Sequence, residues 1–536
     1  MKELFLSKRH CAIILLAILT IGLCYFPYFA FSQNQQILPV HEYEDRVHAI
    51  WSAQMIGALM GFQFEHKVSS VKKVEHFELR DNCIPVDDDW YYEMVAIRAF
   101  EKYGIDMSVE ELGKQWIENS AGSWGSSEQS LSLLKRGIPA ELCGHPRYNK
   151  LWFTIGPQFS SDVYGALAPG MPQVASKLAR KYGHINGYAE AVDGGVFIAG
   201  MISLAFFEKN SQAIVKKASG LIHSSSPYKQ CLNMVIELAE KGKSFREIVN
   251  VVEDRWHLEY PATNNAVANG GIVAACVWFG SGDFLKTVNL AFEAADFSDA
   301  DCNAANAAAV IGAMHGLKGI PENLICVLGD IIKGEKMGGV KLTPVVNESL
   351  LAISKRTVDI GKRMLMQHGT NLKNHNLIIP IEPLKSLPSE IFTLSDLMDY
   401  WNPDWQLERA GFGGAGGGMR GIRGITYLND TILATYPRDE VRGLFLKREI
   451  TIQEEKELFI EVGVDKNRCW ELNIYIDNEH VLRKLIEGKD MERTWFSHKV
   501  DLAHYQGKAV TIRMFQKVLL PGKEAGNAYW KTIRIF

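Results

Sequence analysis

Cysteine is scarce in this sequence of 536 residues: nine are scattered along the chain, and no two form a Cys-x-x-Cys pair. The spacing does not match a zinc ribbon, and so dispersed a set in a long chain is not a disulfide scaffold. Neither sign of charge is in excess, because 58 basic side chains stand against 62 acidic ones. Without a basic footprint, we expect no nucleic-acid partner.

Long hydrophobic runs are also rare. The composition, 47% hydrophobic and 22% charged, is that of a folded soluble chain and argues against a multi-span membrane protein. At roughly 100–200 residues per domain, we expect two to four domains. One long apolar run does occur, from Cys11 to about Phe31, and Lys2, Lys8 and Arg9 precede it.

This run predicts a secretory signal peptide over residues 1–32. A positive flank and an apolar core lead to Ala30 and Ser32, the small residues that a signal peptidase site requires. The alternative is an uncleaved anchor helix, because the run approaches the ~20 residues that span a bilayer. With cleavage, we expect an exported protein, periplasmic or extracellular, that has no integral membrane association.

Residues 40–370 have the pattern of an all-α domain. Ser108 is followed by Glu111 at the spacing of a capping box. Small residues crowd the stretch 304–316, which would allow a helix to lie close to its neighbours. Apolar residues recur at helical spacing in four further segments: 174–182, 190–208, 245–255 and 349–367. Few strands are expected between residues 45 and 368.

Residues 371–395, which contain Pro380, Pro383 and Pro388, are the predicted linker. After it, the hydrophobic pattern changes from helical spacing to short alternating runs. Residues 396–536 predict a jelly-roll-like β-sandwich, because short alternating runs follow one another between turns. These runs are 443–447, 458–462, 470–476 and 509–514. The stretch Gly411–Gly421 predicts a flexible loop, since it lacks the Lys-Ser/Thr pair of a phosphate-binding loop.

Two acidic clusters stand directly before helical runs: Asp87, Asp88 and Asp89 form the first, and Asp299 and Asp301 the second. Helix capping would explain one carboxylate at each start, but not several. Adjacent carboxylates repel one another, and burying them without a counter-charge costs several kcal/mol per ion. Oxygen ligands of this kind suit Mg²⁺, Mn²⁺ or Ca²⁺. The pattern leaves both a metal site and simple capping open.

Four stretches, read together, resemble the ADP-ribosylglycohydrolase family. The resemblance covers about Val47 to Leu324, and the C-terminal domain lies outside it. The stretches that carry it are Ile56–Gly61, a glycine-spaced helix; Asp87–Trp90, similar to a Thr-Asp-Asp-Thr element; a central segment with Ile155, Gly156, Asp162, Gly165 and 169–172; and Phe279–Phe284 followed by Asp299–Asn303.

The resemblance implies an all-α fold with a central site for Mg²⁺ or Mn²⁺, expected as two ions. Its metal ligands would be Asp87, Asp88, Asp89, Asp299, Asp301 and Cys302. Two positions depart from the family pattern: Asp87 stands where a threonine is usual, and Cys302 stands where a hydroxyl ligand is usual. A thiol is a poor ligand for a hard cation. The predicted ligands therefore fit the second ion less well than the first, although Asn303 could replace Cys302 as a ligand through its carbonyl oxygen.

The resemblance also implies hydrolysis of a glycosidic C–N or C–O bond. Two cations could hold vicinal sugar hydroxyls and activate a water, with Asp88 and Asp301 as catalytic residues. Glu65 stands about where some relatives carry a catalytic glutamate; a solvated helix-end acid is the alternative. Asp162, His184 and Asn269 are the predicted substrate-binding residues. For His184 a hydrogen-bonded core role is the alternative, and for Asn269 a helix cap.

The expected substrate is a small ADP-ribose-like, nucleoside-like or carbohydrate compound, and export makes a carbohydrate as suitable as ADP-ribose. The predicted sandwich contains five candidate sugar-stacking residues: Trp401, Trp405, Trp470, Trp495 and Trp530. The alternative is that these tryptophans belong to its core. The competing prediction is a catalytically inactive protein that binds a glycan through this C-terminal domain.

Overall fold

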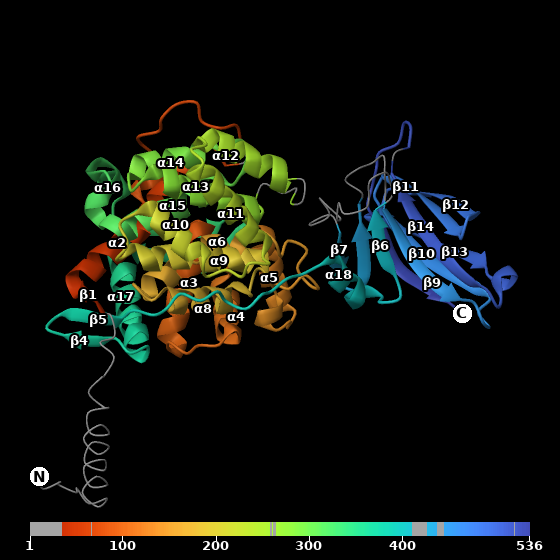
Figure 1. Cartoon of the computed structure of the whole chain (residues 1–536), viewed down its shortest axis with the longest axis horizontal. Helices are drawn as coiled ribbons and strands as arrows, with labels where there is room; N and C mark the ends of the chain where they lie inside the picture. Colours follow the sequence, from red (N-terminus) through yellow and green to blue (C-terminus); the bar gives the residue numbers. More distant parts are fainter. Residues whose placement is uncertain are drawn as a thin grey trace, which may run out of the picture.

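The computed structural model describes residues 35–65, 67–257, 260, 264–409, 426–436, 444–518 and 520–536. The predicted signal peptide, 1–32, and the stretch Gly411–Gly421 lie outside the described residues. A helical domain is followed by a β-sandwich, and the two lie side by side (Figure 1). None of the described helices combines the length and apolar character needed to cross a bilayer.

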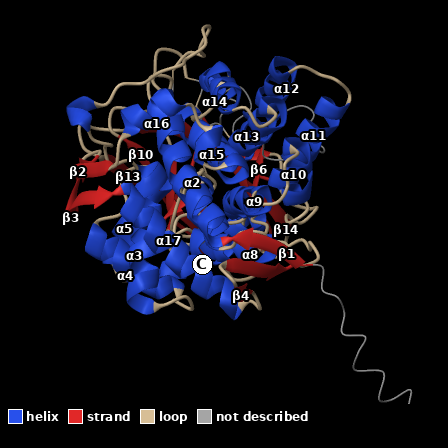
Figure 2. Cartoon of the chain, turned by 90° about the vertical axis from the view of Figure 1, so that its left-hand side faces the viewer, coloured by secondary structure: helices blue, strands red, loops and turns tan. Residues whose placement is uncertain are grey.

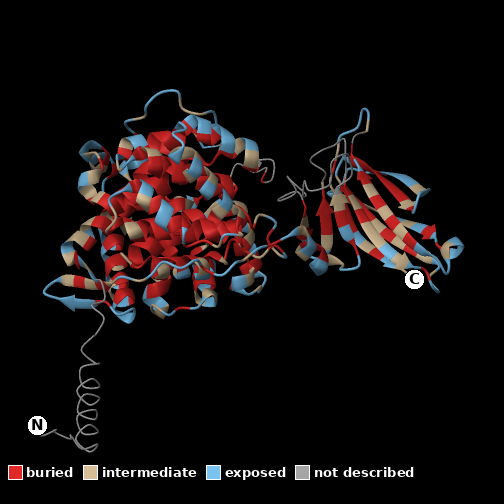
Figure 3. Cartoon of the chain, viewed as in Figure 1, coloured by how far each residue is buried: buried red, intermediate tan, exposed pale blue. Residues whose placement is uncertain are grey.

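The first domain consists mainly of helices packed around a buried centre, which Figure 3 shows as a largely buried interior. Its helices are α2 (Val40–Gly61), α3 (Asp88–Tyr103), α4 (Val109–Asn119), α5 (Gly125–Lys135), α6 (Gly156–Phe159), α7 (Asp162–Leu167), α8 (Pro172–Gly183), α9 (Glu190–Ala205), α10 (Ser211–Ser219), α11 (Pro227–Glu240), α12 (Phe245–Val252), α13 (Ala266–Gly280), α14 (Phe284–Glu293), α15 (Ala300–His315), α16 (Glu322–Leu328) and α17 (Leu350–Gln367). The capping box predicted for Ser108 and Glu111 is present at the start of α4.

Two small sheets lie at the edges of the helical domain (Figure 2). Strands β2 (Ile331–Met337) and β3 (Val340–Ser349) form a hairpin in a region where the sequence indicated few strands. Strands β4 (Asn371–Lys373) and β5 (Asn376–Pro380) pair with each other, and β5 also pairs with β1 (Gln35–Pro39). The first part of the predicted linker 371–395 is therefore a sheet of the helical domain, because its strands find a partner at the distant start of the described chain.

The second domain is a sandwich of two five-stranded antiparallel sheets, joined to the first domain through helix α18 (Leu394–Trp401). One sheet has the order β13-β10-β15-β8-β7 and the other β12-β11-β14-β9-β6. The strands are β6 (Gln406–Arg409), β7 (Tyr427–Asn429), β8 (Ile432–Thr435), β9 (Leu444–Thr451), β10 (Glu457–Asp465), β11 (Cys469–Ile476), β12 (Glu479–Glu487), β13 (Arg493–Asp501), β14 (Ala509–Lys517) and β15 (Ala528–Ile535). The four predicted strand runs coincide with β9, β10, β11 and β14.

Helices α2 and α15 pack in antiparallel contact at the centre of the first domain. A Cβ added at Gly312 on α15 would stand 2.6 Å from the backbone oxygen of Ala49 on α2. At the other end of the pair, a Cβ added at Gly61 would stand 2.6 Å from the Cα of Asp301. The two backbones therefore touch without side chains between them. This contact places the end of α2 directly against the start of α15.

The rest of the predicted linker crosses the surface of the helical domain before it reaches α18 (Figure 1). The Leu387 amide donates to the backbone oxygen of Leu221 at 2.8 Å, and Arg180 donates to that of Pro388 at 2.6 Å. The carboxylate of Glu390 lies 2.8 Å from His184. Residues 381–393 are thus a strap bound to the helices, which positions the sandwich relative to the first domain.

We expect Gly312→Val to lower the free energy of unfolding by about 3 kcal/mol, because the new side chain would force two buried backbones apart. Thermal or urea unfolding of the purified protein measures this change. Gly339→Ala, in the turn of the β2–β3 hairpin, is the matched control, since an added Cβ there meets no heavy atom within 4 Å. Equal stability of the Gly312→Val and Gly339→Ala proteins would contradict the direct backbone contact.

Candidate active site

The two acidic clusters stand at the N-termini of α3 and α15. Asp87 is the N-cap residue of α3 and Asp299 that of α15, and neither side chain makes a capping hydrogen bond. Capping therefore does not explain the clusters. The backbone contact between α2 and α15 brings the second cluster to the end of α2, while α3 carries the first cluster to the same place.

A cavity of about 470 Å³ lies where these helix ends meet. Asp87 and Asp88 line it from α3 and its cap, and Asp299 and Asp301 line it from α15 and its cap. The other lining residues come from several loops and helix starts: Phe62, Glu65, Trp124, Gly125, Ser126, Ser127, Thr154, Ile155, Gly156, Phe159, Asn264 and Cys302. The two clusters, far apart in the sequence, thus face a single cavity.

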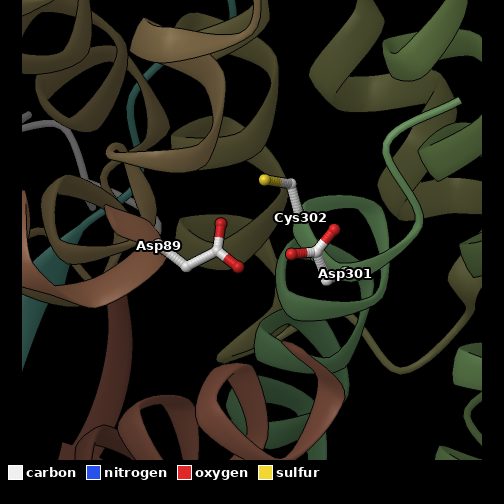
Figure 4. A group of neighbouring side chains, drawn as sticks. All are labelled: Asp89, Asp301 and Cys302. Carbon is white, nitrogen blue, oxygen red and sulfur yellow. The ribbon is translucent and has the colours of Figure 1, made fainter. Parts of the chain in front are cut away.

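Three side chains form the tightest potential ligand group among the described residues. One carboxylate oxygen each from Asp89 and Asp301, together with the Cys302 sulfur, all lie within 4.8 Å of one another. Figure 4 shows Asp89 on one side of the gap and the two α15 residues on the other. This spacing would allow one ion to contact groups from both helices.

Burial makes these carboxylates costly unless something compensates their charge. Asp89 is 1% exposed and Asp301 4% exposed. Among the described residues, no nitrogen or oxygen donor reaches either oxygen of Asp89 or the Oδ1 atoms of Asp87, Asp299 and Asp301. Buried polar atoms without partners are rare in folded proteins. A set composed almost entirely of oxygen acceptors fits a hard divalent cation such as Mg²⁺ or Mn²⁺.

The pKa values of the carboxyl groups agree with this arrangement. Burial raises the pKa of Asp87 to about 6 and holds the pKa values of Asp88, Asp89 and Asp301 well above their ordinary range. The neighbouring carboxylates add to the effect, since each negative charge disfavours the next. Without a cation, the site would therefore keep protons that a bound divalent ion would displace.

Cys302 fits a hard cation less well than the aspartates do. The thiol is 5% exposed, and burial together with the nearby carboxylates raises its pKa well above the ordinary value. A protonated thiol is a weak ligand, and sulfur prefers softer metals. Asn303, the substitute that the sequence suggested, does not line the cavity, and its amide group donates to Asn269 at 2.8 Å. The four cavity-lining aspartates and Asp89 are the better-matched ligands.

Asn269 supports the second acidic cluster from behind. Its side-chain oxygen accepts hydrogen bonds from the Asp299 backbone at 2.9 Å and from the Asn303 amide at 2.8 Å. Its own amide group donates to the Asn265 backbone oxygen at 2.6 Å. Asn269 is fully buried and does not line the cavity. Asn269 therefore positions the second acidic cluster in the structure, and its predicted role in substrate binding stays a prediction.

Two further predicted substrate-binding residues also lie away from the cavity wall. Asp162, the first residue of α7, is fully buried and accepts a hydrogen bond from Asn306 at 2.9 Å. His184 follows the last residue of α8, where it contacts Glu390 of the strap. Neither lines the cavity. His184 thus helps to hold the strap, and Asp162 belongs to the buried layer beneath the acidic clusters.

Glu65, by contrast, does lie at the cavity. It follows the end of α2 and remains exposed, so water reaches its carboxylate. Its negative charge contributes to the raised pKa values of Asp87, Asp89 and Asp301. A carboxylate beside the acidic clusters but open to solvent is suited to exchange protons with a reacting group.

Sequence reasoning missed a further part of the cavity wall. Trp124 and the first turn of α5, Gly125 to Ser127, line this part. The Trp124 indole is 44% exposed, and the β2–β3 hairpin supports it: a Cβ added at Gly338 would stand 2.4 Å from the ring. The first amides of a helix have no acceptor within it, so the turn offers donors. The small polar run before α5 was the available signal.

A mainly helical domain, in which carboxylates from two helix starts line one cavity, defines a helical protein with a buried acidic centre. The sequence model of the ADP-ribosylglycohydrolase family matches residues 39–355, and the chain belongs to this family. Membership indicates a hydrolase of the glycohydrolase type. The family is typically metal-dependent, in agreement with the acidic group at Asp89 and Asp301.

A search of curated proteins found no match. Among solved structures, the chain is similar to the K3 cleaved adhesin domain of Lys-gingipain from Porphyromonas gingivalis, with 10% identity and a TM-score of 0.20 over 25% of this chain and 93% of that one. A structure titled "CBM4 structure and function" has 15% identity and a TM-score of 0.18, over 25% and 87%. A family GH115 4-O-methyl-α-glucuronidase has 8% identity and a TM-score of 0.16, over 68% and 41%. At these scores the likenesses carry no functional argument.

We expect Asn269→Ala to weaken Mn²⁺ binding by about 10- to 100-fold, because Asp299 would lose the group that positions its backbone. Isothermal titration calorimetry of the purified protein measures this affinity. Asn289→Ala is a matched control, since Asn289 holds the backbone of Val74 through hydrogen bonds of 2.6 and 2.9 Å outside the cavity. If both variants bound Mn²⁺ like the wild type, the positioning role would be wrong.

Proposed function

We propose that this protein is an exported, metal-dependent glycohydrolase that cleaves a glycosidic C–N or C–O bond. Its substrate would be an ADP-ribose-like, nucleoside-like or carbohydrate compound. The observation that supports the proposal most strongly is the pairing of two acidic clusters around one cavity, where several buried carboxylate oxygens have no hydrogen-bond partner among the described residues. Such a site is suited to hold one or two Mg²⁺ or Mn²⁺ ions.

The chain's own residues divide the cavity into two ends. At the acidic end, Asp89 and Asp301 would hold a cation, and Asp87, Asp88 and Asp299 would complete its surroundings. A divalent ion bound there supplies Lewis-acid chemistry: it holds vicinal sugar hydroxyls and makes water a better nucleophile. Negative charge gathered at this end also favours the positive charge that develops on a sugar as its glycosidic bond breaks.

Glu65 is the candidate for proton transfer. Its carboxylate lies on the cavity wall next to the acidic end and in contact with solvent. In this position it would deliver a proton to the leaving group or accept one from the attacking water. The negative charge of Glu65 also helps to raise the pKa values of three of the cluster aspartates, Asp87, Asp89 and Asp301.

The opposite end of the cavity would bind the leaving group. Trp124 and Phe159 provide aromatic surface, and Ser126, Thr154 and Asn264 provide hydroxyl and amide groups. Aromatic faces pack against flat rings, while hydroxyl and amide groups fix polar edges. A leaving group with a flat ring and polar substituents suits these walls, which is why the proposal includes nucleoside-like and carbohydrate substrates alike.

We expect Asp301→Ala to reduce turnover of a cleavable substrate by roughly 10³-fold, since loss of a metal ligand removes several kcal/mol of transition-state stabilisation. A panel of ADP-ribosyl, nucleoside and glycoside substrates, assayed for released sugar with Mg²⁺ or Mn²⁺, measures the change; Asp88→Ala should behave alike. Asp359→Ala is the control, because that side chain is 72% exposed on α17. Equal rates in wild type, Asp88→Ala and Asp301→Ala would defeat the assignment.

Cys302 is the one observation that favours a second candidate function. A buried, protonated thiol in place of a hydroxyl ligand weakens the case for a complete two-ion site. The alternative is an inactive protein that binds a glycan through its sandwich. If no member of the substrate panel were cleaved while glycan binding required residues 396–536, this alternative would replace the hydrolase.

We propose that residues 1–32 direct the protein out of the cytoplasm. Expression of the full chain in a secreting bacterial host should yield an exported protein whose first residue, by N-terminal sequencing, is Gln33. Ala30→Arg should block this cut, because signal peptidases require a small residue there. An exported protein that retains residues 1–32 would instead favour the anchor helix, and a protein that stays in the cytoplasm would contradict both.

A further inference from the structure

One outward face of the sandwich carries a row of residues in register across all five strands of its sheet. Neighbours in the row are paired directly, from β7 through β8, β15 and β10 to β13. The row consists of Tyr427, Ala434, Tyr529, Gly463 and Trp495, and we call it the aromatic row. With strands about 4.8 Å apart, it extends over roughly 19 Å. Three of its members are aromatic, and the two between them are small.

Gly463 on β10, the strand between β15 and β13, lets the Trp495 indole lie flat on the sheet. A Cβ added at Gly463 would stand 2.8 Å from the Trp495 ring, so the ring occupies the space above the glycine. Trp495 is only partly buried. Arg493 lies over the Tyr529 ring at 3.7 Å and covers it. Arg493 and Lys531 also lie 5.7 and 5.2 Å from the centre of the Trp495 ring, so a ligand stacked on this partly buried ring would lie beside these two cations.

The other tryptophans considered as sugar-stacking residues do not share this position. Trp405, Trp470 and Trp530 are at most 1% exposed and belong to the core of the sandwich. Trp401 is partly buried at the end of α18 and packs against that core. Trp495 is thus the one of the five that lies on an outward sheet face.

Polar side chains flank the aromatic row on both sides. On one side, Glu461 pairs directly with Ser497 and with Thr532. On the other side, Asp465 is opposite Arg493 and accepts hydrogen bonds from Tyr529 at 2.6 Å and from Asn527 at 3.0 Å. This second side opens into a hollow of about 650 Å³, lined by residues that include Asp465 and Asn527.

Several charges around the row are paired. Lys531, which lies 5.2 Å from the centre of the Trp495 ring, pairs with Glu461 at 2.8 Å. At the hollow, Arg468 pairs with Glu524 at 2.8 Å. Paired charges neither attract a polyanion nor need one for compensation. The face therefore suits a neutral ligand with flat apolar faces and polar edges.

The aromatic row also leads toward the helical domain. Lys150 lies 5.3 Å from the centre of the Tyr427 ring, and Arg136 pairs with Asp430, in the β7–β8 turn, at 2.8 Å. Lys150 belongs to the segment that ends at Thr154, a residue of the catalytic cavity wall. A ligand lying along the row would thus extend toward the segment that leads to Thr154 of the helical domain.

We propose that this outward face, with the partly exposed Trp495 ring as its stacking surface, binds a neutral oligosaccharide chain. A pyranose ring presents an apolar face and a rim of hydroxyls, which matches an indole between two rows of hydrogen-bonding side chains. The middle of the row is buried, with Ala434 0% and Tyr529 4% exposed. The occupant is a chain rather than a single sugar because the polar side chains beside Trp495 and the hollow at Asp465 and Asn527 offer contacts beyond one ring. The inference rests on the sandwich alone and does not require that the helical domain be active.

Affinity electrophoresis of the full-length protein tests the proposal in gels that contain soluble xylan, glucomannan, arabinogalactan or laminarin. At least one of these neutral polysaccharides should retard the wild type, and Trp495→Ala should weaken that binding by about tenfold or more. Trp495→Tyr should retain part of it, because a smaller aromatic ring remains. The wild type migrating freely in all four gels would overturn the proposal.

Two control variants locate the binding site on this sheet. Phe515→Ala removes an aromatic ring from the opposite sheet, where Phe515 stacks on Phe445 at 4.7 Å, and should leave retardation unchanged. Loss of retardation in Phe515→Ala but not in Trp495→Ala would move the site to that sheet and overturn the proposal. Asp301→Ala should bind like the wild type, so a failed hydrolase assignment would not alter this result. Trp495→Ala should still unfold in one cooperative thermal transition, so that a loss of retardation is not a loss of the fold.

Discussion

The backbone contact between α2 and α15 is the constraint on which the candidate site depends. Because no side chain separates the two helices at Gly61 and Gly312, the second acidic cluster sits at the end of α2 and faces the first. Ordinary helix packing would hold the axes 8–10 Å apart, with side chains between them. The resemblance of Ile56–Gly61 to the family's glycine-spaced helix thus has a physical meaning: glycine is the residue that permits this approach.

The same contact creates an electrostatic problem. Five aspartates meet in a region where several of their oxygens find no nitrogen or oxygen donor among the described residues. Burial raises the pKa values of Asp87, Asp88, Asp89 and Asp301. A folded chain tolerates this arrangement when protons or a divalent cation compensate the charge. The acidic centre therefore lowers the stability of the protein when no cation is bound. Asn269 holds the second acidic cluster in place despite this cost.

The strap over residues 381–393 links this centre to the sandwich. Hydrogen bonds to Leu221, Arg180 and His184 bind it along its length, so the second domain is held at a defined place beside the first. The aromatic row on the sandwich begins at the strand that contacts Lys150 and Arg136 of the helical domain. A fixed arrangement of this kind would allow the two domains to act on one extended ligand.

Local patterns in the sequence by themselves determined the helical half, the capping box at Ser108, four of the sandwich strands and the acidic helix starts, since each depends on residues a few positions apart. Only the tertiary structure decided the rest. It showed that Asp88 and Asp301 share a cavity and that Asn269 supports the second acidic cluster from behind. It also showed that His184 holds the strap, and that Trp495 alone among the five tryptophans lies on an outward sheet face. These outcomes depend on which distant segments pack together, and packing is set by the fit of whole surfaces rather than by any local spacing.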